Sequence, residues 1–109
     1  MTSNDDKLFR SSVLENDSAS LGAAETMTFH MSNGTDDATN RYLNMDSGVS
    51  FGLEVVPTVA CSITEINGRT FKAPLSVGTG GLRAQHIRLT RFTVQAGSAT
   101  VVEVFAKGG

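Results

Sequence analysis

Apolar and polar residues alternate in most segments after residue 25, and this alternation is typical of strands that bury one face. Residues 26–31 alternate strictly, with methionine and phenylalanine on one face. In residues 49–55 the apolar face comprises Val49, Phe51, Leu53 and Val55. Because no segment of useful length places apolar residues at helical spacing, the pattern predicts an all-β fold.

The clearest predicted hairpin covers residues 59–77, around an Asn-Gly turn signal. In a three-residue loop with Gly68 as the left-handed residue of a bulge, Ile63 lies opposite Phe71 and the pairs on that face match. A two-residue turn would set Ile63 opposite Lys72, so the pattern favours the bulged hairpin. The expected inner face comprises Val59, Cys61, Ile63, Phe71 and Leu75.

A one-residue slip interrupts the apolar phase near Thr90. Ile87 and Leu89 point one way, and after the slip Phe92 and Val94 take over the apolar phase. Such a slip indicates a bulge, and a bulge is how a strand bends from one sheet of a sandwich into the other.

A small-residue turn at residues 96–98 leads into the last predicted strand, residues 99–106. A three-residue loop at this turn pairs Arg91 with Glu103, and the opposite charges favour that hairpin. Together these strands predict a small antiparallel β-sandwich or jelly-roll-like domain over residues 25–109.

Residues 1–24 are polar and acidic and follow neither a helical nor a strand period. We interpret them as an extended N-terminal arm that becomes ordered by docking on a partner. A flexible tail without a role is the alternative. The apolar side chains with which the arm would dock are Leu8, Val13, Leu14 and Leu21.

The composition limits the size of the core. The chain has 109 residues, 39% of them hydrophobic, with no Trp and one Tyr, so it forms one domain that partners can complete. Residues 1–46 hold eight acids against three bases, a balance of −5, while residues 47–109 hold three acids against six bases, a balance of +3. This asymmetry suits contact between neighbouring copies, and two independently solvated surfaces explain it equally well.

The sequence offers no recognisable catalytic, cofactor-binding or metal-binding group. His30 and His86 fall on the polar faces of alternating strands, and no third ligand accompanies them. Cys61, the single cysteine, excludes an internal disulfide and reads as a small buried residue. The acids Asp36 and Asp37 lack calcium-loop spacing. We therefore expect no enzyme activity and no cofactor.

Other ligand classes are also disfavoured. The glycine-rich residues 78–81 match no phosphate-binding motif. No basic run with interleaved aromatics indicates nucleic acid, and no segment approaches the roughly 20 apolar residues of a membrane helix. The first ten residues lack the features of a signal peptide, so we expect synthesis in a cytoplasm.

Three runs in the second half of the chain carry a resemblance. They read CSITEINGRTFKAPLSV, HIRLTRFTVQAG and SATVVEVFAKGG. In the succession of their strands and turns, these runs resemble small virion proteins of tailed bacteriophages, namely capsid decoration (cement) proteins and tail or fibre components. The resemblance implies a β-sandwich or jelly-roll subunit, symmetric assembly, an arm that docks on a neighbour, and no catalysis.

The first hypothesis is therefore a virion structural protein of a tailed phage, located in the virion. It would be a decoration protein, expected as a trimer, that bridges neighbouring subunits of the major capsid protein. The alternative is a tail or fibre-tip module that binds a host receptor or glycan. Tyr42 is the sole tyrosine, so this alternative lacks the rings on which sugar sites usually depend. Neither hypothesis involves nucleic acid, membrane or a small-molecule substrate.

Overall fold

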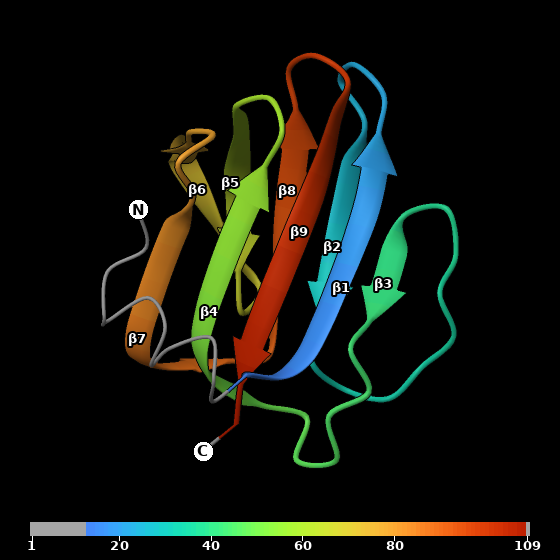
Figure 1. Ribbon diagram of the computed structural model, residues 1–109, viewed down its shortest axis with the longest axis vertical. Helices are drawn as coiled ribbons and strands as arrows, with labels where there is room; N and C mark the ends of the chain where they lie inside the picture. The colour runs from blue at the N-terminus through green and yellow to red at the C-terminus, as the bar shows by residue number, and fades with distance from the viewer. Residues whose placement is uncertain (1–12, 109) are drawn as a thin grey trace.

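The computed structural model describes residues 13–108, which form two β-sheets packed face to face (Figure 1). The strands of the described chain are β1 (Val13–Leu21), β2 (Thr26–His30), β3 (Asn40–Tyr42), β4 (Ser50–Pro57), β5 (Cys61–Ile66), β6 (Arg69–Val77), β7 (Leu82–Leu89), β8 (Arg91–Ala96) and β9 (Thr100–Lys107). The predicted all-β sandwich is confirmed.

The two sheets differ in size. The four-stranded sheet has the order β1-β9-β4-β7, and the five-stranded sheet has the order β3-β2-β8-β5-β6. Neighbouring strands are antiparallel except β2 and β3, which run parallel. In Figure 1 the four-stranded sheet faces the viewer, and β5, β8 and β2 lie behind it. Because β6 stands last in the order of the larger sheet, it is an edge strand.

The core lies between the sheets and follows the alternation of the sequence. Phe29 of β2 and Phe92 of β8 are fully buried, and their rings stack with centroids 5.1 Å apart. Val102 and Val104 of β9 are fully buried as well. Each fully buried side chain of this kind contributes about 1.5–3 kcal/mol relative to an exposed one, so these strands stabilise the sandwich.

The predicted crossing near Thr90 is confirmed. β7 belongs to the four-stranded sheet and β8 to the five-stranded sheet, and Thr90 is the residue between them. Leu89 and Phe92 are both fully buried although they are an odd number of positions apart. The slip in phase therefore lets one continuous segment contribute to both sheets while its apolar side chains remain in the core.

The predicted pairing of the last two strands is wrong. β8 and β9 lie in different sheets, so Arg91 does not face Glu103. Glu103 instead lies between Ser18 of β1 and Val56 of β4. The short turn after β8 therefore connects the two sheets. β8 already has β2 and β5 as neighbours in the larger sheet, and β9 pairs with β1 and β4 in the smaller one.

The central hairpin confirms part of its prediction. Gly68 has a positive φ of 88°, as expected. Asn67 also has a positive φ, 53°, and Ile66 pairs with Arg69, so the loop is a two-residue turn. The three-residue bulged loop and its pairing of Ile63 with Phe71 are therefore wrong.

The register of the hairpin is reset beyond the turn rather than at it. Glu65 pairs with Thr70, but Ile63 pairs with Leu75, so residues 71–74 of β6 lie outside the regular ladder. Cys61 and Ile63 are buried as predicted. The other three residues of the expected inner face are exposed, namely Val59, Phe71 and Leu75.

The proposed arm is partly a strand of the sandwich. Val13 and Leu14 begin β1, which pairs with β9 of the same subunit. Leu21 is buried in the core of that subunit, so it is not available to dock on another. The sandwich therefore includes β1, which corrects its expected start at residue 25, because β9 supplies an edge on which β1 pairs. Leu8 lies outside the described residues.

Candidate functional site

The edge strand β6 is the most exposed strand of the described chain. Every residue from Arg69 to Ser76 is exposed, and we call this stretch the β6 surface. Two large apolar side chains lie on it, Phe71 with 36% of its surface exposed and Leu75 with 42%. Apolar groups of this size gain free energy when another surface covers them.

Leu75 is exposed because the two sheets differ in size. Leu75 pairs with Ile63, so the two side chains lie on the same face of the sheet. Ile63 is 1% exposed, whereas Leu75 is 42% exposed. The inward face of the larger sheet therefore continues past the part that the smaller sheet covers.

The backbone edge of β6 is protected against pairing with a further strand. Pro74 has no N–H to donate, Lys72 places a charge on the edge, and residues 71–74 depart from the ladder. These features suppress open-ended strand addition. The β6 surface therefore presents side chains rather than a ladder of backbone groups.

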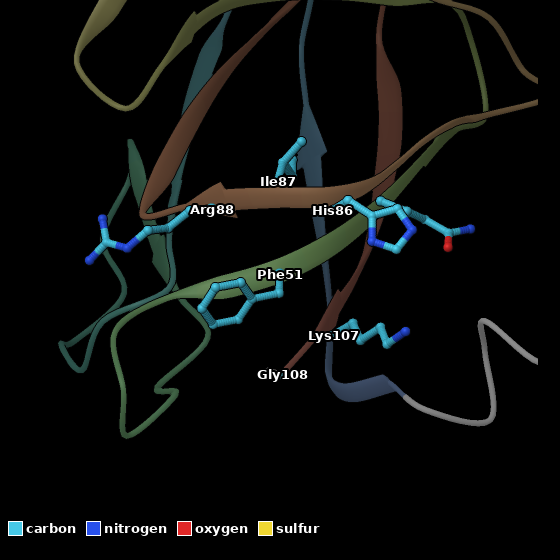
Figure 2. Close-up of a pocket in the computed structure, with 7 residues that line it drawn as sticks. Phe51, His86, Ile87, Arg88, Lys107 and Gly108 are labelled. Carbon is cyan, nitrogen blue, oxygen red and sulfur yellow. The ribbon is translucent and has the colours of Figure 1, made fainter.

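A half-open cavity of about 480 Å³ lies elsewhere, where β7 bulges away from β4 (Figure 2). Ser50 pairs with Leu89 and Gly52 pairs with Gln85, so residues 86–88 of β7 stand against the single residue Phe51. The residues that line the cavity are Phe51, Gln85, His86, Ile87, Arg88, Lys107 and Gly108.

This bulge corrects the expected face of Phe51. The alternation of residues 49–55 predicts that Phe51 is buried, but 42% of its surface is exposed. Ser50 is fully buried instead, and its hydroxyl oxygen lies 2.5 Å from the carbonyl oxygen of Gly52 and 2.9 Å from that of Lys107, so its single hydrogen is shared between them. The bulge turns the Phe51 ring outward into the cavity.

The lining of the cavity is cationic. Arg88 and Lys107 carry positive charge, His86 adds an imidazole, and none of the described residues that line the cavity is acidic. Among the described residues, none of these three side chains forms an ion pair. Figure 2 shows Phe51 between Arg88 on one side and His86 and Lys107 on the other, with Ile87 pointing away from the ring.

His86 has a positive φ of 61°, a backbone angle that residues other than glycine rarely adopt. The pattern of residues predicts an ordinary surface histidine in a regular strand, and no sequence signal marks the bulge. The Phe51 ring on β4 and the Lys107 side chain on β9 come near His86 because β4 lies between β7 and β9 in the sheet. Only pairing across the sheet brings them together.

The second histidine has a structural role. The Nε2 atom of His30 lies 2.8 Å from Oδ1 of Asn40, and its ring stacks on Tyr42 with centroids 4.5 Å apart. These contacts connect β2 to β3. Within residues 13–108, no three His, Cys, Asp or Glu side chains gather where they could hold a metal ion.

The acids of the loop between β2 and β3 are engaged by the loop itself. Oδ1 of Asp37 accepts hydrogen bonds from the backbone N–H groups of Thr39 at 2.9 Å and Asn40 at 2.8 Å. The bond from Thr39, followed by that from the Asn40 side chain, lowers the pKa of Asp37. Asp36 accepts the Tyr42 N–H at 2.7 Å, so both carboxylates serve the loop geometry.

Two glutamates of the sandwich form ion pairs with arginines. Glu65 pairs with Arg91 at 3.1 Å. Glu54, which is buried, pairs with Arg83 of the neighbouring strand at 3.1 Å. Glu103 is exposed on β9, away from Arg91. Glu65 and Glu54 are therefore each engaged by an arginine.

Comparison with known proteins adds no relative. No family model matches the chain, and neither the curated proteins nor the solved structures yield a match. Within residues 13–108, no helix has the length and apolar character needed to cross a membrane.

Proposed function

We propose that this protein is a non-catalytic structural module that attaches to a larger protein assembly through the β6 surface. The observation that carries the proposal is the full exposure of residues 69–76, with Phe71 and Leu75 among them. A soluble domain that leaves such side chains uncovered along an edge strand offers a surface that a partner can bury.

The charges of the β6 surface define the chemistry of the partner. Arg69 and Lys72 lie on it, and it contains no acidic residue. A complementary protein surface would place apolar side chains against Phe71 and Leu75 and carboxylates around them. Because the backbone edge is protected, the docking would depend on side chains and would not extend into a fibre.

The more specific form of the proposal rests on the resemblance in sequence. The runs that contain β6, β8 and β9 resemble virion proteins of tailed phages. We propose that the protein is a capsid decoration protein that bridges subunits of the major capsid protein, assembling with copies of itself as a trimer. The exposed β6 surface supports attachment to another protein but does not distinguish a capsid from a tail.

The test replaces one apolar side chain of the β6 surface with a charge. Leu75→Asp is the first variant and Phe71→Asp the second. Val101→Asp is the matched control, because Val101 is also 42% exposed but lies on β9 in the other sheet. Sedimentation velocity measures self-association, and co-sedimentation with phage particles measures attachment.

We expect both β6 variants to remain folded and to lose association by roughly tenfold or more, because a carboxylate would have to lose its water at the interface. Val101→Asp should associate like the unmodified protein. Equal behaviour of all three variants, or a protein that is monomeric and binds no particle, would contradict the proposal.

A second function is favoured by a separate observation. The cationic cavity at the β7 bulge could bind a ligand, which suits a receptor-binding or glycan-binding module. This cavity contains no residue of β6, so the two functions can be tested independently.

A further inference from the structure

From the β7 bulge we infer a binding site for an organic anion, specifically a carboxylate carried on a flat ring. The site consists of the Phe51 ring, the side chains of Arg88 and Lys107, and the imidazole of His86. The inference does not depend on attachment through β6, because the site and the β6 surface share no residue.

The cavity has the size and composition of a ligand site. Its volume of about 480 Å³ lies within the roughly 300–1,000 Å³ range of small-molecule pockets. Phe51 and Ile87 provide apolar surface, and Gln85 adds an amide that can donate or accept hydrogen bonds. A few polar groups around an apolar floor give a ligand both contact area and orientation.

The charge of the lining selects an anion. Arg88 and Lys107 form no ion pair with another described residue, and the lining residues within 13–108 include no acid to neutralise them. Arginine favours a carboxylate because its planar fork can donate two parallel hydrogen bonds. Figure 2 shows Arg88 on one side of the Phe51 ring and Lys107 on the other, so an anion held by either cation would place its attached group near that ring.

The exposed phenylalanine selects a flat group. Phe51 lines the cavity, and 42% of its surface is exposed. An aromatic ring can stack on it, and the apolar face of a sugar ring can pack against it. The shared chemistry is therefore a ring-borne carboxylate, and its source is either an acidic sugar or an aromatic acid.

The backbone of His86 supports a role for this bulge. Non-glycine residues with positive φ are disfavoured and persist only where the surrounding structure holds them, often at ligand sites. A purely structural bulge could hold glycine at this position with less strain. His86 holds this backbone conformation while its imidazole lines the cavity.

The experiment is an NMR titration of the ¹⁵N-labelled full chain. The probes are glucuronate and benzoate, with glucose and benzamide as neutral analogues and inorganic phosphate as an anion without a ring. We expect either acid or both to shift the amide signals of Phe51, residues 85–88 and residues 107–108, with dissociation constants on the order of millimolar for so open a site. The neutral analogues should cause no such shifts.

The variants separate the contributions of charge and ring. The double variant Arg88→Gln with Lys107→Gln should weaken binding of the acids roughly fivefold to thirtyfold. The double variant Arg69→Gln with Lys72→Gln changes the net charge equally on the β6 surface and should bind like the unmodified protein. Phe51→Ala should remove the preference for the ring acids over phosphate.

His86→Gly tests the imidazole without disturbing the backbone, because glycine accepts the positive φ. We expect a stable protein with weaker binding. Unchanged binding by this variant would remove His86 from the site and leave the two cations and the ring.

The other outcomes decide the inference as a whole. Binding of glucuronate alone assigns the site to acidic sugars, and binding of benzoate alone assigns it to aromatic acids. Phosphate that binds as tightly as both acids would overturn the role of the ring. Absence of shifts with either acid at about 10 mM, a concentration above the expected dissociation constants, would overturn the inference.

Discussion

Nε of Arg91 lies 3.1 Å from Oε2 of Glu65, although the two residues are 26 positions apart in the chain. Glu65 is the penultimate residue of β5, and Arg91 begins β8. The same carboxylate accepts a hydrogen bond from the Thr93 hydroxyl at 2.9 Å and another from the backbone N–H of Gly68. One side chain thus connects the hairpin turn to the central strand of the larger sheet.

This relationship predicts a pH dependence of stability. Burial of the Glu65 carboxylate acts to raise its pKa, but hydrogen bonds from Thr93, Gly68 and Arg91 together lower the pKa below the usual value of 4.5. The ionised form is therefore favoured in the folded protein. Its contribution is fully present above about pH 4.5 and is lost as the pH falls through the lowered pKa.

We expect Glu65→Gln to reduce the free energy of unfolding by about 1 kcal/mol at pH 7, since it removes the charge from a hydrogen-bonded carboxylate. The difference from the unmodified protein should shrink as the pH falls below 4.5 through the lowered pKa of Glu65. Urea denaturation at pH 7 and at an acidic pH measures the difference. Glu103→Gln, at an exposed position of β9, is the control and should show little effect at either pH.

The two-residue turn predicts a specific sensitivity to substitution. Gly68→Ala should lower the free energy of unfolding by about 1 kcal/mol, because φ of 88° is unfavourable for a residue with a Cβ atom. The added Cβ would lie 3.4 Å from Nη2 of Arg91, an ordinary contact, so the cost arises in the backbone. Gly97→Ala is the control, because no atom lies within 4 Å of its added Cβ and its φ is not positive. Equal stability of the two variants in urea denaturation would contradict the turn geometry.

Cys61 should be unreactive in the folded protein. The thiol is 5% exposed, and burial raises its pKa above the usual 9.0, so little thiolate is present at pH 8. We expect Ellman's reagent to modify Cys61 slowly in buffer and quickly in concentrated urea. Rapid modification of the folded protein would show that β5 is not packed as described.

Two truncations test the role of the N-terminal residues. Removal of residues 1–24 eliminates β1, uncovers the edge of β9 and leaves the core without Ala19 and Leu21. We expect this truncation to lower the free energy of unfolding by about 3 kcal/mol or more. Removal of residues 1–12 retains every described strand and should leave the stability close to that of the full chain.

The same pair of truncations locates any docking function of the N-terminal residues. If removal of residues 1–12 leaves the fold intact but abolishes attachment to particles, the docking segment lies in those residues. Attachment at the affinity of the full chain would place the contact elsewhere, as the β6 surface predicts. Thermal denaturation and co-sedimentation measure the two effects separately.

The sequence by itself determined the features that depend on neighbours along one strand. The alternation of β2 and β5 predicts the core side chains Phe29 and Ile63, since successive side chains point to opposite faces. The slip in phase at Thr90 predicts the passage between sheets, and the Asn-Gly pair predicts the positive φ of Gly68. These are local properties of the backbone.

The tertiary structure alone decided which strands are neighbours. Opposite charges on Arg91 and Glu103 favour a hairpin, yet the two strands lie in different sheets, because β9 pairs with β1 and β4. Leu75 has the pattern of a core residue but is exposed, since the smaller sheet does not cover it. The cavity likewise requires β7, β4 and β9 together. Pairing depends on edges that segments far apart in the sequence supply, and the alternation within a strand carries no information about which edge it meets.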